Sequence, residues 1–257
     1  MSDALSRHFG LEGKVAVVTG GASGFGKATA RLFAAAGATV VVADMDTAGA
    51  ETVATEIGGI AITFDLDDDA SIAAMVAETV QRTGRLDVLV NNAAIYPRFA
   101  MEAANEADWQ RLQKTNVWGC FVTLRECARA MRAGGQGGRI INVSSIGGAR
   151  TAVDDQILYN ATKAALDSMT KSAALELASD GILVNSVLPG AFLPLDPKPR
   201  ASAHVAPTGP LVSPGRIPLG RYGNAYEVAG PILMLASAAG SYCTGQTLII
   251  DGGFAVS

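Results

Sequence analysis

Short runs of apolar residues, rich in valine and isoleucine, alternate along the 257-residue chain with longer stretches that carry apolar residues at helical spacing. The short runs are nearly continuous in apolar residues, which is typical of parallel strands covered on both faces of a sheet. We therefore predict seven buried strands, over residues 14–19, 39–43, 60–64, 87–91, 139–143, 183–187 and 248–250.

The stretch between the first two predicted strands illustrates the helical pattern. Ala28, Leu32, Phe33 and Ala36 share one stripe of a helix over 25–36, and Gly37 follows as a stop signal. Strand, helix and strand in succession imply right-handed crossovers, so the expected fold class is α/β, a doubly wound parallel sheet with helices on both faces. Neither a break in composition nor an internal repeat divides the chain, which favours a single domain over residues 1–257.

Composition excludes several classes of protein. Apolar residues make up 49% of the chain and charged residues 17%, which is not the composition of a disordered protein. A net charge of −4 without long runs of like charge argues against nucleic acid as a partner. Three cysteines with no C-x-x-C pair and two distant histidines disfavour disulfides, a metal site and a Ser-His triad. No apolar run approaches the roughly 18 residues of a membrane span, and we expect a cytoplasmic protein.

A glycine-rich turn follows the first predicted strand and leads directly into the first long helix. Gly20, Gly24 and Gly26 stand in the sequence TGGASGFG. Glycines at such a turn let the backbone approach a pyrophosphate, and the N–H groups at the start of the helix then face the phosphates. The pattern therefore predicts a dinucleotide site.

Asp44 ends the second predicted strand, 18 residues after Gly26. A carboxylate there can accept hydrogen bonds from both hydroxyls of the adenosine ribose, and it repels a 2′-phosphate. Neither Ser23 nor Met45 offers a positive charge that would hold such a phosphate. An ordinary aspartate that caps the next turn is the alternative, but together with the glycine turn Asp44 favours NAD over NADP.

Tyr159 and Lys163 stand four residues apart in a helical stretch, so their side chains project from one face. A phenol titrates near 10, and a neighbouring ammonium is expected to lower that pKa by favouring the phenolate. Ser145, at the end of the fifth predicted strand, is in a position to hold a substrate oxygen beside the phenol. The three side chains together form a candidate site in which a phenol lies beside a substrate oxygen.

These residues resemble the short-chain dehydrogenases/reductases over essentially the whole chain. Further matching segments are Asp65-Leu66, Asn91-Asn92-Ala93-Ala94, Asn116 within TNVWG, Pro189-Gly190 and the tail YCTGQTLIIDGG. The resemblance implies a Rossmann-type fold and a catalytic tetrad of Asn116, Ser145, Tyr159 and Lys163. It also implies the cofactor-binding residues Gly20, Ser23, Gly24, Phe25, Gly26, Asp44, Met45, Asp65, Leu66, Asn92, Tyr159, Lys163, Pro189 and Phe192. Pro194 stands where many members carry a threonine that contacts the nicotinamide amide.

The activity implied by the resemblance is NAD-dependent transfer of hydride between the cofactor and a secondary alcohol, polyol or sugar hydroxyl, with the reverse carbonyl reduction open to the same site. Tyr159 would exchange the proton, Ser145 would hold the substrate oxygen, and Lys163 would stabilise the phenolate and hold the nicotinamide ribose. Asn116 would support a water chain. The alternatives are a 3-ketoacyl or steroid-type carbonyl reductase, and a non-catalytic NAD-binding sensor or interaction protein.

Three features bear on the substrate and on partners. Arg98 and Arg150 lie in segments that border the substrate mouth in the family, so either is a candidate for holding an anionic group, although solvated surface arginines are the simpler interpretation. The proline-rich segment at about 191–219 is expected to form a substrate loop or lid. By resemblance we also expect a homotetramer, or alternatively a homodimer.

Overall fold

The computed structural model describes residues 3–151, 155–193 and 216–256. Seven parallel strands form one sheet in the order β3-β2-β1-β4-β5-β6-β7. Their bounds are β1 Val15–Thr19, β2 Thr39–Asp44, β3 Ile60–Thr63, β4 Val88–Asn91, β5 Gly138–Val143, β6 Ile182–Pro189 and β7 Thr247–Ile250. The predicted α/β fold and all seven predicted strands are confirmed, although β6 extends further than the predicted 183–187.

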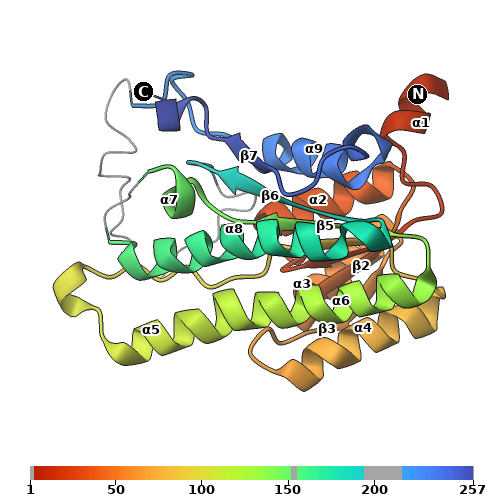
Figure 1. The fold of residues 1–257 in the computed structure, drawn as a ribbon, viewed down its shortest axis with the longest axis horizontal. Coiled ribbons are helices and arrows are strands. Elements are labelled where there is room, and N and C mark those ends of the chain that lie inside the picture. The colour runs from red at the N-terminus through yellow and green to blue at the C-terminus, as the bar shows by residue number, and fades with distance from the viewer. Residues whose placement is uncertain (1–2, 152–154, 194–215, 257) are drawn as a thin grey trace.

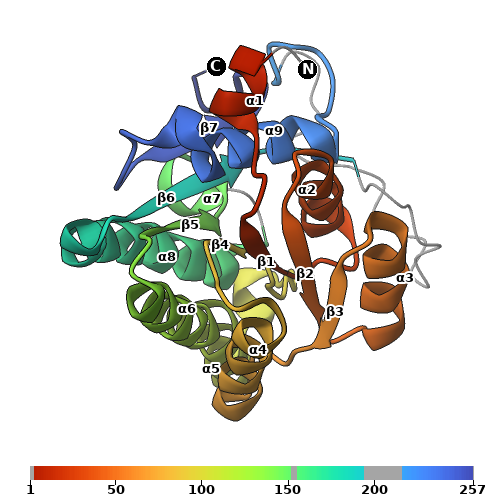
Figure 2. The ribbon, with the colours of Figure 1, turned by 90° about the vertical axis from the view of Figure 1, so that its right-hand side faces the viewer.

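Helices cover both faces of this sheet, as Figure 2 shows. One layer contains α2 (Gly24–Ala35), α3 (Thr47–Ile57) and α9 (Ala225–Ala236). The other contains α4 (Asp69–Thr83), α5 (Glu106–Gln113), a π-helical turn η2 (Lys114–Gly119), α6 (Cys120–Gly134) and α8 (Ile157–Leu177). Two short helices, α1 (Asp3–Phe9) and α7 (Ile146–Ala149), complete the main elements drawn in Figure 1.

The burial of the central strands explains their nearly continuous apolar sequence. Every residue of β1 and β4 is buried, because side chains that point to either face meet a helix layer. The two faces contribute to separate apolar clusters: Val17 and Leu89 belong to the one under α4, α6 and α8, whereas Val18 and Val90 belong to the one under α2, α3 and α9. The alternation of strand side chains therefore divides the core into two layers.

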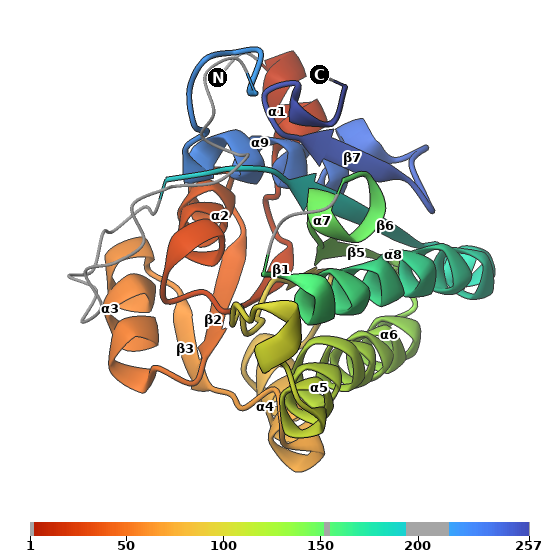
Figure 3. The ribbon, with the colours of Figure 1, turned by 90° about the vertical axis from the view of Figure 1, so that its left-hand side faces the viewer.

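The sheet also determines where a ligand can bind. From β1 the strand order runs through β2 to β3 on one side, and through β4 to β7 on the other. In open α/β sheets the crevice for a ligand lies at the carboxyl ends of the strands, where this order reverses. Figure 3 looks toward the end of the molecule at which α7 and the start of α8 lie.

Most of the proline-rich segment, residues 194–215 and with them Pro194, lies outside the described residues. The prediction that this segment forms a lid therefore stays a prediction. Among the described residues, the helices are too short or too polar to cross a membrane. The same residues contain no group of three or more histidine, cysteine, aspartate or glutamate side chains arranged to bind a metal ion.

Candidate active site

The glycine turn after β1 brings the start of α2 against the end of that strand. A Cβ on Gly26 would lie 2.8 Å from Asn92 Nδ2 and would overlap the carbonyl oxygen of Gly20. Gly24 has a left-handed φ of 55°, and a Cβ there would meet nothing within 4 Å. The helix therefore packs on the strand only because residue 26 has no side chain, and the turn presents open space at residue 24. Ser23, the N-cap of α2, makes no side-chain capping hydrogen bond.

Asn92 links the ends of β1 and β4, the two strands between which the strand order reverses. Its Nδ2 donates to the carbonyl oxygens of Thr19 at 2.9 Å and Gly20 at 3.2 Å. The backbone N–H of Asn92 donates to Thr19 Oγ1 at 3.0 Å, and this hydroxyl donates to the carbonyl of Val90. Asn92 thus holds the glycine turn from the β4 side, which is a supporting role for the predicted cofactor residues.

Asp44 lies at the carboxyl end of β2, beside the glycine turn. Its Oδ2 accepts from the backbone N–H of Ala22 at 3.0 Å and its Oδ1 accepts from that of Asp46 at 3.0 Å. A carboxylate has about four lone-pair sites, so Asp44 can accept further hydrogen bonds beside the two from the backbone. The half-buried Asp44 and the exposed Met45 next to it therefore border the same edge as Gly20 and Gly24.

The remaining predicted cofactor residues lie around this edge. Asp65 is exposed and Leu66 is buried in the turn after β3, and Pro189 ends β6 beside Ile250 of β7. The rings of Phe25, in the first turn of α2, and Phe192, just after β6, meet edge to face with centroids 5.2 Å apart. The structure therefore brings the segment after β6 onto the start of α2.

Ser145, Tyr159 and Lys163 meet at the carboxyl end of β5. Ser145 is the N-cap of α7, where its Oγ accepts from the Gly147 N–H at 3.2 Å, and it also hydrogen-bonds the Tyr159 hydroxyl. Lys163 is only 2% exposed, and its ammonium donates to the carbonyl of Val143 at 2.8 Å. The same ammonium lies 5.6 Å from the centre of the Tyr159 ring. The predicted serine, tyrosine and lysine are thus assembled in one place.

Burial is the main influence on the ionisation of this cluster. It raises the pKa of Tyr159 above its ordinary value, Cys120 adds to the increase, and the Ser145 hydrogen bond opposes it. Burial also lowers the pKa of Lys163. The net shift of the Tyr159 pKa is therefore upward, opposite to the expected lowering, because burial removes water from around the phenolate. The Lys163 ammonium is directed at the Val143 carbonyl.

Asn116 lies in the π-helical turn and is fully buried. Its Oδ1 accepts from the N–H of Ile95 at 2.9 Å, and its Nδ2 donates to the carbonyl of Ile95 at 2.9 Å and to Thr162 Oγ1 at 3.3 Å. Thr162 in turn donates to the carbonyl of Tyr159 at 2.7 Å. Asn116 therefore connects the segment after β4 with α8 through Thr162, which is hydrogen-bonded to the turn that carries Tyr159.

Two residues that were not among the predicted site residues lie at the same place. The ring of Tyr96 packs edge to face on the ring of Tyr159, with centroids 4.7 Å apart. Gln156, which is buried, donates its side-chain amide to the Tyr96 hydroxyl. The sequence places Tyr96 directly after Ile95, close to the Asn-Asn motif, and this was the only available indication of its role. Its contact with the Tyr159 ring spans 63 positions, and no local sequence pattern predicts such a contact.

The two candidate arginines differ in their surroundings. Arg98 lies 3.8 Å from the Asp155 carboxylate, and the Phe99 N–H donates to the Asp155 carbonyl at 2.8 Å. Asp155 has a left-handed φ of 59°. Arg150 is an exposed residue at the C-cap of α7. Arg98 therefore already faces a carboxylate, and the prediction that either arginine holds an anionic substrate group stays a prediction.

The sequence and the fold resemble those of known proteins. A family model described as Enoyl-(Acyl carrier protein) reductase matches residues 20–255. The chain is 38% identical to sorbitol dehydrogenase of Cereibacter sphaeroides over 95% of its own length and 98% of that protein. It also resembles a short-chain type dehydrogenase/reductase of Mycobacterium marinum, with a TM-score of 0.88, 38% identity and coverage of 97% and 98% of the two chains.

A second solved structure is the 3-ketoacyl-(acyl-carrier-protein) reductase of Brucella melitensis complexed with NADH. The TM-score is 0.86 at 34% identity, and the match covers 96% of this chain and all of the other. The chain belongs to the short-chain dehydrogenase/reductase family, and it is an oxidoreductase of that family.

Proposed function

We propose that the protein is an NAD-dependent dehydrogenase that oxidises a secondary alcohol, polyol or sugar hydroxyl, and that the same site reduces the corresponding carbonyl. The observation that carries the proposal is the meeting of Ser145, Tyr159 and Lys163 at the sheet edge that also holds the glycine turn. The 38% identity to a sorbitol dehydrogenase supports an alcohol of the polyol class.

The residues at the edge fit a nicotinamide dinucleotide. A side chain on Gly26 would overlap the Gly20 carbonyl, and the position of a Cβ on Gly24 is open, so the turn leaves space for a group that approaches the backbone. The N–H groups at the start of α2 suit a pyrophosphate. Asp44, which accepts from two backbone N–H groups, suits the ribose hydroxyls of NAD and disfavours a 2′-phosphate.

When bound, the cofactor supplies the acceptor or donor of hydride. The protein's own part is to position the substrate and move a proton. Ser145 donates to the substrate oxygen, and Tyr159 gives its proton to that oxygen during reduction or removes it during oxidation. Because burial raises the pKa of Tyr159, the phenol is protonated near neutral pH and is ready to act as an acid. Lys163 provides positive charge beside the phenolate that forms during oxidation.

The first experiment screens alcohols, polyols and hydroxy acids with NAD and with NADP, followed by the absorbance of the reduced cofactor. We expect turnover with NAD, and a Tyr159→Phe variant that binds NAD normally but loses turnover. A variant with wild-type rates would contradict the assignment of Tyr159. Binding of NAD without turnover of any substrate in either direction would favour the alternative function, a non-catalytic sensor.

Cofactor choice has its own test. Asp44→Asn keeps the shape of the side chain but removes the charge, so we expect it to lower the preference for NAD over NADP by about 10-fold or more, since hydrogen bonds to charged groups contribute roughly 1.5–3 kcal/mol. A wild-type enzyme that prefers NADP would refute the choice of cofactor without affecting the reaction class.

A 3-ketoacyl reductase is the second candidate. It is favoured by the similarity to the Brucella melitensis reductase. Comparing the rates of acetoacetyl thioester reduction and polyol oxidation distinguishes the two. We further propose that the protein is cytoplasmic, that it assembles as a homotetramer, and that the segment at about 191–219 closes over the substrate; light scattering on the purified protein tests the assembly.

A further inference from the structure

The π-helical turn that carries Asn116 is an unusual piece of backbone. It spans Lys114–Gly119, between α5 and α6. π-helical turns are rare, and they persist where surrounding contacts hold them. On the inner side, Asn116 itself provides such contacts through Ile95 and Thr162. The outer side needs contacts of its own.

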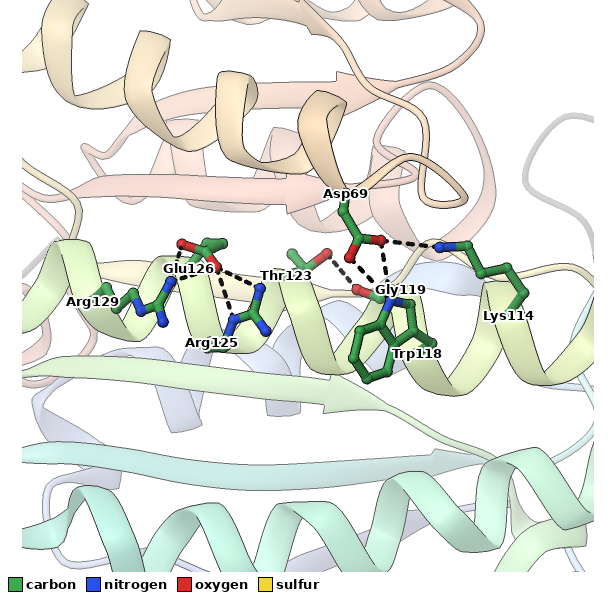
Figure 4. Close-up of polar contacts among 8 residues, drawn as sticks. All are labelled: Asp69, Lys114, Trp118, Gly119, Thr123, Arg125, Glu126 and Arg129. Atoms are coloured by element: carbon green, nitrogen blue, oxygen red, sulfur yellow. Dashed lines mark hydrogen bonds and ion pairs between the residues drawn. The ribbon is translucent and has the colours of Figure 1, made fainter.

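Those contacts come from the first residue of α4, as Figure 4 shows. Asp69, the first residue of α4, accepts at Oδ1 from Lys114 Nζ at 3.0 Å. Both of its carboxylate oxygens lie within hydrogen-bond distance of Trp118 Nε1, at 3.0 and 3.1 Å. Lys114 and Trp118 are the first and the fifth residues of the π-helical turn, so one carboxylate bridges almost its whole length.

A third contact fixes the distance between the two segments. A Cβ on Gly119, the last residue of the turn, would overlap the carbonyl oxygen of Leu66. Leu66 therefore packs directly on the end of the turn, through its carbonyl oxygen and its side chain. Lys114 also holds the pKa of Asp69 below its ordinary value, aided by Trp118, so the carboxylate is charged across the working pH range.

We propose that Asp69 is a positioning residue for Asn116: by bridging Lys114 and Trp118 it keeps the π-helical turn in the register that presents Asn116 to Ile95 and to Thr162 of α8. This inference rests on the proposed function, because it assigns Asp69 to the support of the same catalytic site. Asp69 itself lies on the outer side of the turn, where its carboxylate contacts Lys114 and Trp118.

The test uses Trp118 as a reporter. The chain has only two tryptophans, so a Trp109→Phe background leaves Trp118 alone. Into it we introduce Asp69→Ala, which removes both contacts, and Asp69→Asn, which keeps an acceptor for Trp118 but not the charge that faces Lys114. The matched control is Glu78→Gln, which breaks an exposed ion pair with Arg82 at 3.1 Å on the same helix, away from the turn.

Exposed contacts of this kind are individually weak, so we expect Asp69→Ala to lower kcat about 3-fold to 10-fold while KM for NAD changes less than 2-fold. Its Trp118 emission should shift, and Asp69→Asn should lie between it and the parent. The Glu78→Gln control should match the parent in kcat and emission. Equal kcat values for Asp69→Ala and Glu78→Gln would overturn the proposal.

The emission shift depends on the protein alone, so a failure of the proposed function is distinguishable. If the parent shows no turnover with any substrate, the proposed function fails, and hydrogen exchange at the N–H of Ile95 then reports whether Asn116 has lost its partner. Faster exchange in Asp69→Ala than in Glu78→Gln supports the positioning role, and equal rates overturn it. Lys114→Met, which removes one of the two contacts from the other side, should reproduce part of the effect in either measurement.

Discussion

The close approach of α2 to β1 gives the sharpest prediction for the cofactor site. In Gly26→Ala the new methyl group would overlap the Gly20 carbonyl and lie 2.8 Å from Asn92 Nδ2. Carbon atoms pack at about 3.5 Å or more, so the start of α2 must move by roughly 1 Å. Overpacking of this kind costs about 1–3 kcal/mol of folding free energy.

The same displacement moves the N–H groups that are proposed to face the pyrophosphate. Each hydrogen bond lost to a charged group costs about 1.5–3 kcal/mol, which is roughly 10-fold to 100-fold in affinity. We therefore expect isothermal titration calorimetry to give a Kd for NAD at least about 10-fold weaker in Gly26→Ala, and thermal unfolding without cofactor to show a lower Tm.

Gly230→Ala provides a control with the same chemical change. Gly230 lies inside α9, where a Cβ would meet nothing within 4 Å. Alanine is a better helix former than glycine by about 0.8–1.0 kcal/mol, so this variant should gain stability and bind NAD normally. Wild-type NAD affinity in Gly26→Ala would refute the account of the glycine turn.

Three further outcomes follow from single contacts. Because burial raises the pKa of Tyr159, alcohol oxidation should accelerate with pH through the alkaline range, and a flat profile would contradict this. Asp87 is 5% exposed, and although burial raises its pKa, the hydrogen bond from Arg85 and other contacts bring it below the ordinary value. The charged Asp87 therefore stabilises the folded state at pH values above the pKa of Asp87 in the unfolded chain, and this contribution is lost as the pH falls through its lower pKa in the folded protein. Urea unfolding should therefore show Asp87→Asn about 2 kcal/mol less stable at neutral pH, with a smaller difference in acid. Tyr96→Leu removes an aromatic contact with Tyr159 and should reduce kcat by up to about 10-fold; an unchanged kcat would show that the ring contact does not position the phenol.

The elements of the fold were predictable because their signals are local. Buried parallel strands need apolar residues on both faces, so β1 and β4 are visible as short continuous runs. The helical stripe over 25–36 was equally clear, and α2 was found at Gly24–Ala35. Strand ends were less certain: β6 runs on to Pro189 because Pro189 still pairs with Ile250 of the neighbouring strand.

Part of the candidate site was predictable for the same reason. Tyr159 and Lys163 are one helical turn apart, so any helix brings them together. Asp44 and Ser145 each follow a strand, and the carboxyl ends of parallel strands meet at one edge of a sheet. For these residues, position in the sequence was enough to predict position in space.

Contacts between distant segments were not predictable. The π-helical form of the turn around Asn116 depends on Ile95 and Thr162 within the site and on Asp69 outside it. None of these partners is a sequence neighbour of Asn116. The pairing of Arg98 with Asp155 is of the same kind, and it alters the interpretation of an arginine that the sequence offered as a substrate contact.

Spacing over a few residues was enough to predict the succession of strands and helices along the chain, the glycine turn and the pairing of a tyrosine with a lysine on one helix face. The environment of those groups depends on contacts between distant segments, which are visible only in the folded protein. Burial reverses the expected direction of the Tyr159 pKa shift, since the cost of removing water from a phenolate depends on every segment that packs around it.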